Sequence, residues 1–316
     1  MIGYTYGRKR SGIRRELKTK VEEWLKSIKD QDVRDAAKED VIITGGSIAS
    51  MLLGEPINDF DCYFRTKETT LKVARYYVDK FNKKHTVKIT PGVNPYTPEV
   101  REEKLPNAKG EMEDRIVIWI KSAGVAGEAQ TSYSYFESRT EDETKDFVKS
   151  TAHTIKKKQK KKYRVTFMSD NAITLTNKMQ IIIRFYGEPD EIHDNYDFQH
   201  AMCYYDHAKQ DLSLPASALE ALMSRTLIYQ GSLYPIASIF RMKKFIERGW
   251  RITAGQQLKI MWQISELNLQ DKNVLREQLV GVDMAYMHQL IEALKDIDEK
   301  KINASYVATV IDRIFD

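Results

Sequence analysis

Two short segments of the sequence carry residue types suited to phosphate chemistry, and the first is Gly-Gly-Ser. It occupies positions 45–47, directly after the apolar run 41–44 and before residues with helical periodicity. A strand that ends in such a turn and opens a helix presents free backbone N–H groups and the positive end of the helix dipole. We therefore expect Gly45, Gly46 and Ser47 to hold the phosphate groups of a nucleotide.

The second segment contains two carboxylates, Asp59 and Asp61, which alternate with apolar residues. In a strand this alternation places both carboxylates on one face, about 6–7 Å apart. Like charges at that distance repel unless a cation lies between them, and Mg²⁺ favours carboxylate and phosphate oxygens. A phosphate site beside such a pair is typical of two-metal nucleotidyl transfer. The alternative is a strand end that faces water, with Phe60 and Phe64 buried behind it.

The two segments also stand in a familiar register. Residues 45–61 read GGSIASMLLGEPINDFD, which resembles the signature GGxVRDxLLGxxxxDhD of polymerase-beta-type nucleotidyltransferases, in particular the class II tRNA CCA-adding enzymes and poly(A) polymerases. The resemblance implies that Asp59 and Asp61 are catalytic and bind two Mg²⁺ ions, with Mn²⁺ as the alternative metal. Ala49 and Ser50 replace the Arg-Asp of the signature, so that contribution to triphosphate binding is missing or comes from elsewhere in the chain.

A later segment, residues 197–206, resembles the RRDFTxNA…D motif of the same family without its two arginines. The resemblance makes Asp197 the candidate for a third catalytic and metal-binding carboxylate, or for a contact to the ribose of the nucleotide. Asp194 is the reserve candidate, and an exposed acidic stretch is the alternative interpretation. We expect His193 and His200 to be structural.

A weaker resemblance joins residues 241–245 to the RxxRF stretch that opens the helical neck in that family. Arg241 and Lys244 lie one helical turn apart on one face. The resemblance implies that they contact the incoming nucleotide or the acceptor backbone. A solvated basic face is the alternative.

Positive charge is concentrated in two blocks on a nearly balanced chain, which has 50 basic and 45 acidic residues and a net charge of +5. One block lies within residues 8–20 and the other within 156–164. Such blocks favour contact with a polyanion. In the second block we expect six lysines to bind nucleic acid, with a solvated loop as the alternative: Lys156, Lys157, Lys158, Lys160, Lys161 and Lys162.

Hydrophobic periodicity predicts an α+β chain. Expected helices span residues 12–30, 68–83, 215–230, 234–248, 254–268 and 284–297, with a helical turn at 48–53. Expected strands span 41–44, 59–64, 85–90, 115–121, 163–168, 171–175 and 179–186. Residues 91–114 and 137–162 have loop composition, so we interpret 91–162 as an elaboration. The resemblance implies a mixed sheet with helices over 1–210, the catalytic domain, and the helical pattern predicts an all-α domain over 211–316.

Composition narrows the class of protein further. The longest apolar runs are far shorter than the ~18 residues of a membrane span, and Cys62 and Cys203 are the chain's two cysteines. We expect a cytoplasmic protein without a disulfide framework. The leading hypothesis is a template-independent transferase that joins NMP from an NTP to an RNA 3′ end, such as that of a tRNA, and releases pyrophosphate. The alternatives are transfer to a protein or small-molecule hydroxyl, or a non-catalytic nucleic-acid-binding protein on the same fold.

Overall fold

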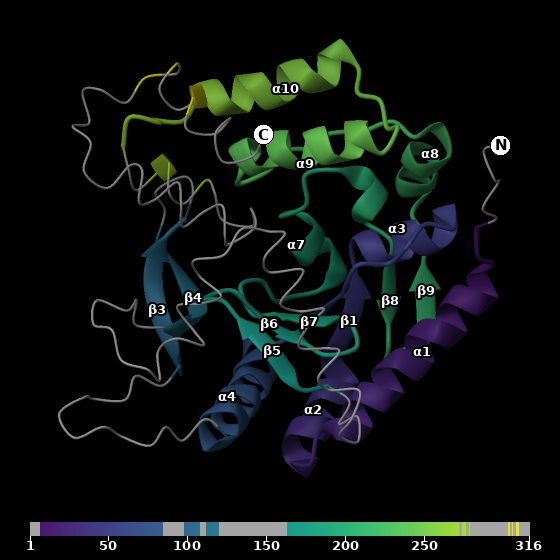
Figure 1. Ribbon diagram of the computed structural model, residues 1–316, viewed down its shortest axis with the longest axis vertical. Helices are drawn as coiled ribbons and strands as arrows, with labels where there is room; N and C mark the ends of the chain where they lie inside the picture. The colour runs from purple at the N-terminus through teal and green to yellow at the C-terminus, as the bar shows by residue number, and fades with distance from the viewer. Residues whose placement is uncertain are drawn as a thin grey trace.

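The structure, a computed structural model, describes residues 7–84, 98–107, 112–119 and 163–271, together with isolated positions from 274 onward. A sheet of seven strands lies at its centre, with helices on either side (Figure 1). The strands of this sheet are β1 (Val41–Thr44), β2 (Phe60–Phe64), β5 (Val165–Met168), β6 (Ala172–Leu175), β7 (Met179–Ile182), β8 (Tyr204–Asp206) and β9 (Asp211–Ser213).

The sheet is mixed, and its strand order is β5-β6-β7-β2-β1-β8-β9. Strands β2 and β7 pair in parallel, and every other neighbouring pair is antiparallel. A separate hairpin joins β3 (Glu99–Pro106) to β4 (Met112–Trp119). The centre of the large sheet is the β1–β2 pair, in which Thr44 lies opposite Asp61. This register brings the Gly-Gly-Ser turn, which follows β1, and the carboxylate pair, at the start of β2, to the same end of these two strands.

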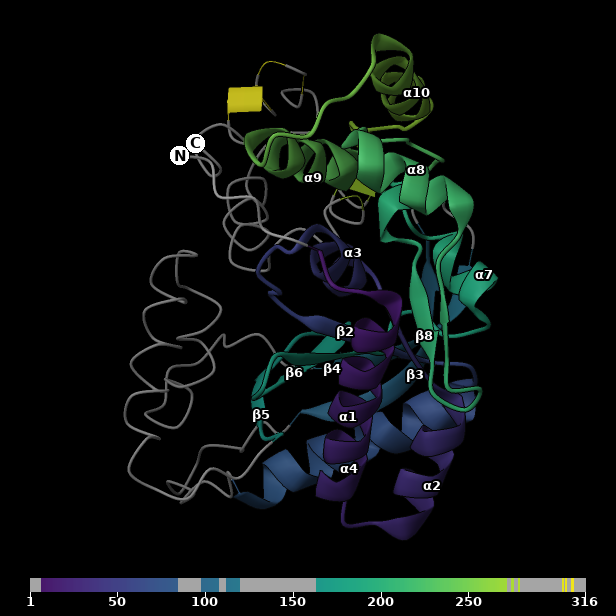
Figure 2. The same ribbon diagram turned by 90° about the vertical axis from the view of Figure 1, so that its right-hand side faces the viewer.

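One face of the sheet packs on three helices: α1 (Arg10–Ser27), α2 (Gln31–Asp40) and α4 (Lys67–Lys84) (Figure 2). Strand β2 sends Phe60, Cys62 and Phe64 into this core because alternate side chains of a strand share a face. The Trp24 ring lies 6.2 Å from that of Phe64. Its indole N–H, also buried, donates to the hydroxyl of Tyr77 at 2.9 Å.

The opposite face of the sheet is more polar. Ile42 and Tyr63 form a small apolar cluster there with Ile192 of α7 (Pro189–His193). Because strand side chains alternate, Asp61 shares this face with Tyr63. The hydroxyl of Tyr196 donates to that of Tyr63 at 3.2 Å. The carboxylate is therefore separated by the sheet from the main hydrophobic core.

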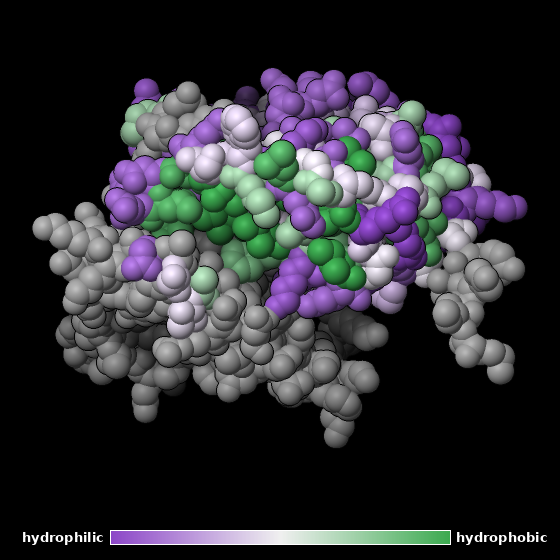
Figure 3. All heavy atoms as spheres, turned by 90° about the horizontal axis from the view of Figure 1, so that it is seen from above, coloured by the Kyte–Doolittle hydropathy of each residue, from purple (hydrophilic) through white to green (hydrophobic). Residues whose placement is uncertain are grey.

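Helices alone follow the last strand within the described residues. They are α8 (Ala216–Ser224), α9 (Pro235–Glu247) and α10 (Ala254–Ser265). Helix α8 packs against the short helix η1 (Gln199–Ala201), and α10 packs against α9, which separates it from the short helix α3 (Gly46–Leu53) (Figure 1). Seen from above, this side of the molecule carries apolar side chains (Figure 3). On α10 the exposed ones are Leu258, Met261 and Trp262.

The expected fold class is confirmed: a mixed sheet with helices precedes a helical C-terminal part. The expected helices 12–30, 68–83, 234–248 and 254–268 correspond to α1, α4, α9 and α10, whereas α8 is shorter than 215–230. The expectation of a loop over 91–114 is wrong in part, because β3 and the start of β4 lie there. Their strands are rich in Glu, Arg and Lys, which hides the pattern of a strand. Helix α2 and strands β8 and β9 were not predicted from the sequence.

Several expectations lie outside the described residues: the strand at 85–90, the helix at 284–297 and the charged stretch 137–162. The division at residue 210 remains a prediction, and β9 follows that residue while still pairing with β8. None of the helices in the described part of the chain is long and apolar enough to cross a membrane.

The Trp24–Tyr77 hydrogen bond supports the packing of α1 on α4, and it generates a prediction. Tyr77→Phe leaves the buried indole N–H without this partner, which we expect to lower the free energy of unfolding by about 1–3 kcal/mol. Chemical denaturation measures the change. Tyr76→Phe is the matched control, because the Tyr76 hydroxyl bonds the backbone of Lys29 at an exposed position and its loss should cost less. Equal effects of the two variants would contradict a special role for the buried bond.

Candidate functional site

The turn after β1 is built around Gly45. Its φ of 92° lies in a region that glycine adopts readily. A Cβ at this position would lie 2.9 Å from Oδ2 of Asp61 and 3.4 Å from the hydroxyl of Tyr196. The backbone N–H of Gly45 donates to the carbonyl of Ala201 at 3.1 Å. Gly45 is therefore needed for the close approach of the Asp61 carboxylate, and its own N–H is already used.

Helix α3 begins at Gly46, and its first turn faces a cavity. The first N–H groups of a helix have no partner within it, and they carry the positive end of its dipole. Gly46 and Ser47 line the cavity. Ser47 is only 3% exposed, and its hydroxyl has no hydrogen-bond partner among the described residues. A buried hydroxyl of this kind is expected to bond a ligand or water, and here it adjoins free helix N–H groups.

The carboxylate pair lies at the same cavity. Asp59 is exposed and lies directly before β2. Asp61 is the second residue of that strand and is partly buried. Burial raises the pKa of Asp61 to about 7, and the neighbouring Asp59 adds to the rise. Loss of water also raises the pKa of Asp59, against the opposing charge of Lys178. Without a cation, the protein therefore disfavours the charged state of both groups.

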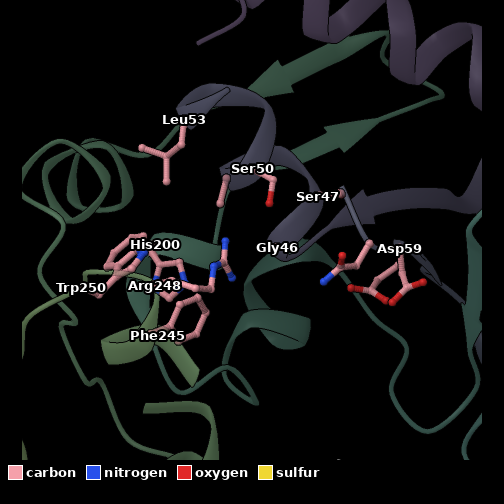
Figure 4. A pocket seen from close by; sticks show the side chains of 12 residues that line it. Gly46, Ser47, Ser50, Leu53, Asp59, His200, Phe245, Arg248 and Trp250 are labelled. Atoms are coloured by element: carbon pink, nitrogen blue, oxygen red, sulfur yellow. The ribbon is translucent and has the colours of Figure 1, made fainter. Parts of the chain in front are cut away.

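A cavity of about 130 Å³ joins these residues to the end of α9 (Figure 4). On one side lie the first turn of α3 and the two aspartates. On the other side lie His200 from η1, Phe245 from α9, and two residues just after α9. The described lining residues are Gly46, Ser47, Ala49, Ser50, Leu53, Asn58, Asp59, Asp61, His200, Phe245, Arg248 and Trp250.

Arg248 is the one basic residue among those described in the cavity lining. Its guanidinium forms an ion pair with Glu55, which also binds Arg225 at 3.0 Å. The same lining includes Ala49 and Ser50, the two residues that replace Arg-Asp of the signature. The cavity thus has small side chains where the signature places Arg-Asp, and Arg248, which follows α9, lines the opposite wall.

Asp197 is not among the residues that line the cavity. Arg241 donates from Nε to Oδ2 of Asp197 at 2.6 Å, so the two residues predicted for separate roles form one ion pair. Among the described residues, no group of three or more His, Cys, Asp or Glu side chains converges on a point that could hold a metal ion. The structure therefore does not bring Asp197 together with Asp59 and Asp61 as a third metal ligand.

The other predicted residues fall into three sets: Lys244, the six lysines, and the two histidines. Lys244 is exposed on α9 and is not among the residues that line the cavity. The six lysines between 156 and 162 lie outside the described residues, so their expected contact with nucleic acid stays a prediction. His193 and His200 are buried, and burial lowers the pKa of each to about 4. That neither is catalytic stays a prediction.

The donor set fits a divalent metal bound together with a nucleotide. Two carboxylates supply hard oxygen ligands, and Mg²⁺ is typically held by one or two carboxylates plus substrate phosphates and water. Burial and the neighbouring Asp59 raise the pKa of Asp61, so a cation bound between the two carboxylates would favour their charged state. The helix N-terminus and the unpartnered Ser47 hydroxyl lie at the same cavity, ready for phosphate oxygens.

Sequence analysis missed the functional candidates at the far wall of the cavity. Arg248 and Trp250 lie next to the segment that resembles the helical neck, but neither was assigned a role. Their approach to α3 depends on how α9 packs against η1, which no local pattern reveals. The single signal in the sequence was the replacement of the signature's arginine by Ala49, which left open whether another segment supplies a cation.

Fold and site together define an α+β protein with a carboxylate pair and a helix N-terminus at one cavity. The model of the family described as "Gabija anti-defense 2 family protein" matches residues 15–225. The chain belongs to this family. A relative named Gabija anti-defense 2, from Bacillus phage SPbetaL7, is 24% identical over 123 residues. That match covers 38% of this chain and 31% of the relative.

Solved structures give only distant likenesses. The CCA-adding enzyme of Thermotoga maritima in complex with tRNA matches with a TM-score of 0.36 and 12% identity, over 87% of this chain and 53% of that chain. The CCA-adding enzyme of Bacillus stearothermophilus in complex with CTP matches with a TM-score of 0.36 and 13% identity, over 86% and 51%. Overlaps this weak carry no argument for function, which must rest on the site.

The raised pKa of Asp61 generates a prediction about stability. Because the folded protein holds this proton to about pH 7 and the unfolded chain releases it near pH 4, raising the pH between these values removes stability. Asp61→Asn stays neutral, so we expect it to stabilise the metal-free protein above pH 7 by up to a few kcal/mol. Unfolding by denaturant at a series of pH values, without metal, measures this. Asp79→Asn, at an exposed position of α4, is the control; a gain of the same size there would contradict the prediction.

Proposed function

We propose that this chain is a divalent-metal-dependent nucleotidyltransferase that moves NMP from an NTP to an acceptor hydroxyl. One observation carries the proposal: Asp59 and Asp61 share a single cavity with the first turn of α3 and the unpartnered hydroxyl of Ser47. In the reaction, the acceptor hydroxyl gives up its proton to solvent water and its oxygen forms a bond to the α-phosphorus. The bond from that phosphorus to the oxygen that bridges to the β-phosphorus breaks, and this oxygen stays with the leaving group. Pyrophosphate leaves.

The protein's own residues divide the work of binding. Asp59 and Asp61 would hold Mg²⁺, which supplies neutralisation of the transferring phosphate and activation of the attacking hydroxyl when bound. The N–H groups at the start of α3 and the hydroxyl of Ser47 would bind phosphate oxygens. Gly45 keeps the Asp61 carboxylate close to this turn. Because the metal ions and the phosphate site would hold the triphosphate in one orientation, the acceptor hydroxyl would attack a phosphorus that is already positioned, which lowers the entropic part of the barrier.

Arg248 would supply the positive side chain that the signature places at position 49. In the absence of ligand its charge is balanced by Glu55, which Arg225 also contacts. A phosphate entering the cavity can therefore take Arg248 while Glu55 keeps Arg225. This exchange leaves no carboxylate unpaired, which lowers its cost.

For the acceptor we propose an RNA 3′ end. The run of lysines between 156 and 162 supports this choice, since clustered lysines bind phosphates without regard to sequence. The family name supports a role against Gabija defence, in which the transfer would act on a component of that defence. A protein hydroxyl therefore remains the second candidate acceptor.

One experiment separates these acceptors. The purified protein is incubated with each labelled NTP and Mg²⁺, once with total RNA and once with purified Gabija proteins, and the products are run on gels. Label in an RNA band supports the RNA acceptor, and label in a protein band supports the second candidate. Absence of label in both, with folded protein and all four NTPs, would contradict nucleotidyl transfer to these acceptors.

Removal of either metal carboxylate generates the central functional prediction. Asp59→Ala or Asp61→Ala should lower the rate of transfer about a hundredfold or more, because several kcal/mol of transition-state stabilisation depend on the metal. The rate of label incorporation measures this. Asp79→Ala, at an exposed position of α4, should keep wild-type activity. Variants of Asp59 and Asp61 that fold and retain full turnover would sink the assignment.

The lysine run generates a separate prediction about RNA. Neutralising all six lysines to glutamine should weaken RNA binding and flatten its salt dependence, by about 0.7–0.9 in the log–log slope for each lost phosphate contact. Binding at a series of salt concentrations measures the slope. The control replaces six exposed lysines that lie outside both basic blocks: Lys29, Lys38, Lys72, Lys83, Lys209 and Lys259. An unchanged slope in the 156–162 variant would favour the protein acceptor.

A further inference from the structure

The wall of the cavity opposite α3 is aromatic, and phosphate binding does not need aromatic rings. Three rings meet there: His200, Phe245 and Trp250 (Figure 4). The ring centroid of His200 lies 4.5 Å from that of Trp250 and 4.5 Å from that of Phe245. Phe245 and Trp250 are themselves 5.5 Å apart. The three rings therefore pack against one another in tilted and edge-to-face arrangements.

Two nitrogen atoms of this wall are buried without a partner among the described residues. They are Nδ1 of His200 and Nε1 of Trp250, on side chains of residues that are only 2% and 4% exposed. Buried polar atoms are almost always hydrogen-bonded, so each one calls for an explanation. Both residues line the same cavity as Ser47, whose hydroxyl also lacks a partner. The shared location points to one ligand or to ordered water in that cavity.

The chemistry of the wall narrows the ligand. The Trp250 indole can only donate, whereas a neutral imidazole nitrogen can donate or accept. Burial keeps His200 neutral by lowering its pKa to about 4. A purely apolar ligand would leave both nitrogens unsatisfied, and a phosphate would gain nothing from three rings. A planar group with a polar edge satisfies both requirements.

We propose that His200, Phe245 and Trp250 form a nucleobase-binding subsite. The base would bond Nε1 of Trp250 and Nδ1 of His200 through its polar edge and would contact the rings with its face. Aromatic side chains bind bases in this way without strict sequence preference. Arg248 adds to the wall, since its guanidinium lies over the ring of Phe245 at 5.3 Å.

This subsite rests on the proposed function, because a base bound at the aromatic wall would belong to a nucleotide whose phosphates lie at the start of α3 in the same cavity. The base can come from the incoming nucleotide or from the terminal residue of the acceptor. Both sources present the same chemistry to the wall, so only binding experiments with each alone can separate them.

The first experiment observes Trp250 directly. The protein has four tryptophans, so ¹⁵N-tryptophan labelling gives four indole N–H signals by NMR, and Trp250→Phe identifies the relevant one. We expect α,β-methylene-ATP with Mg²⁺ to shift the Trp250 signal. Inorganic tripolyphosphate with Mg²⁺ should bind without a comparable shift, because it lacks a base.

The second experiment measures affinity by calorimetry. Trp250→Phe keeps a ring and removes the N–H, and should weaken binding of α,β-methylene-ATP by about threefold to tenfold. Binding of tripolyphosphate should stay at the wild-type value. The matched control is Trp262→Phe, the same substitution at a residue that is 66% exposed on α10, and it should change neither. If Trp250→Phe does not fold, His200→Phe keeps a ring and removes the other unpartnered nitrogen.

The outcomes separate the two proposals. If the nucleotide analogue leaves the Trp250 signal unchanged but a short RNA with a free 3′ end shifts it, the subsite binds the acceptor's base. If neither ligand shifts the signal, and neither aromatic variant changes binding, the subsite is disproved while nucleotidyl transfer can stand. If wild-type protein binds no tripolyphosphate with Mg²⁺, the proposed phosphate site fails, and a response to adenosine or RNA still decides the base subsite.

Discussion

The site depends on the close approach of the Asp61 carboxylate to the turn at Gly45. Any Cβ at position 45 would lie 2.9 Å from a carboxylate oxygen, so only glycine leaves room for it. Burial of the Asp61 carboxylate beside this turn raises its pKa to about 7, and the neighbouring carboxylate of Asp59 adds to the rise. A protein that keeps two carboxylates in this arrangement loses stability unless a cation joins them.

The fold maintains this constraint from three directions. Pairing of β1 with β2 fixes Thr44 opposite Asp61, so the turn and the carboxylates stay at the same end of these two strands. The N–H of Gly45 is bonded to the carbonyl of Ala201, which ties the turn to η1. From the other side, the end of α9 closes the cavity through the ion pair of Arg248 with Glu55. The cavity is thus shared between the sheet and the C-terminal helices.

Prediction from sequence worked for local structure and for which residues lie together. The turn at 45–47 and the pair Asp59 and Asp61 follow from residue type and spacing, and the structure brings Gly46, Ser47 and both aspartates to one cavity. Long amphipathic helices such as α1 and α9 were predictable for the same reason. Their apolar stripes are a local property of the sequence.

Prediction failed where tertiary contacts decide. The β3–β4 hairpin is rich in charged residues, and its strand pairing is not visible in hydrophobic periodicity. The ion pair of Asp197 with Arg241 joins segments that are distant in sequence, and residue spacing did not reveal it. The role of Asp197, as a metal ligand or as a contact to the ribose, stays a prediction. The aromatic wall depends on η1 meeting the end of α9. Such meetings arise from packing, so residue spacing alone does not reveal them.

The most direct measurement of the central claim is the position of a bound metal. Crystals grown with Mn²⁺ and α,β-methylene-ATP allow the ion to be located from its anomalous scattering. We predict Mn²⁺ in contact with the carboxylates of Asp59 and Asp61, with phosphate oxygens beside Ser47 at the start of α3. Mn²⁺ and nucleotide bound together at another location, with the two aspartates left free, would contradict the claim.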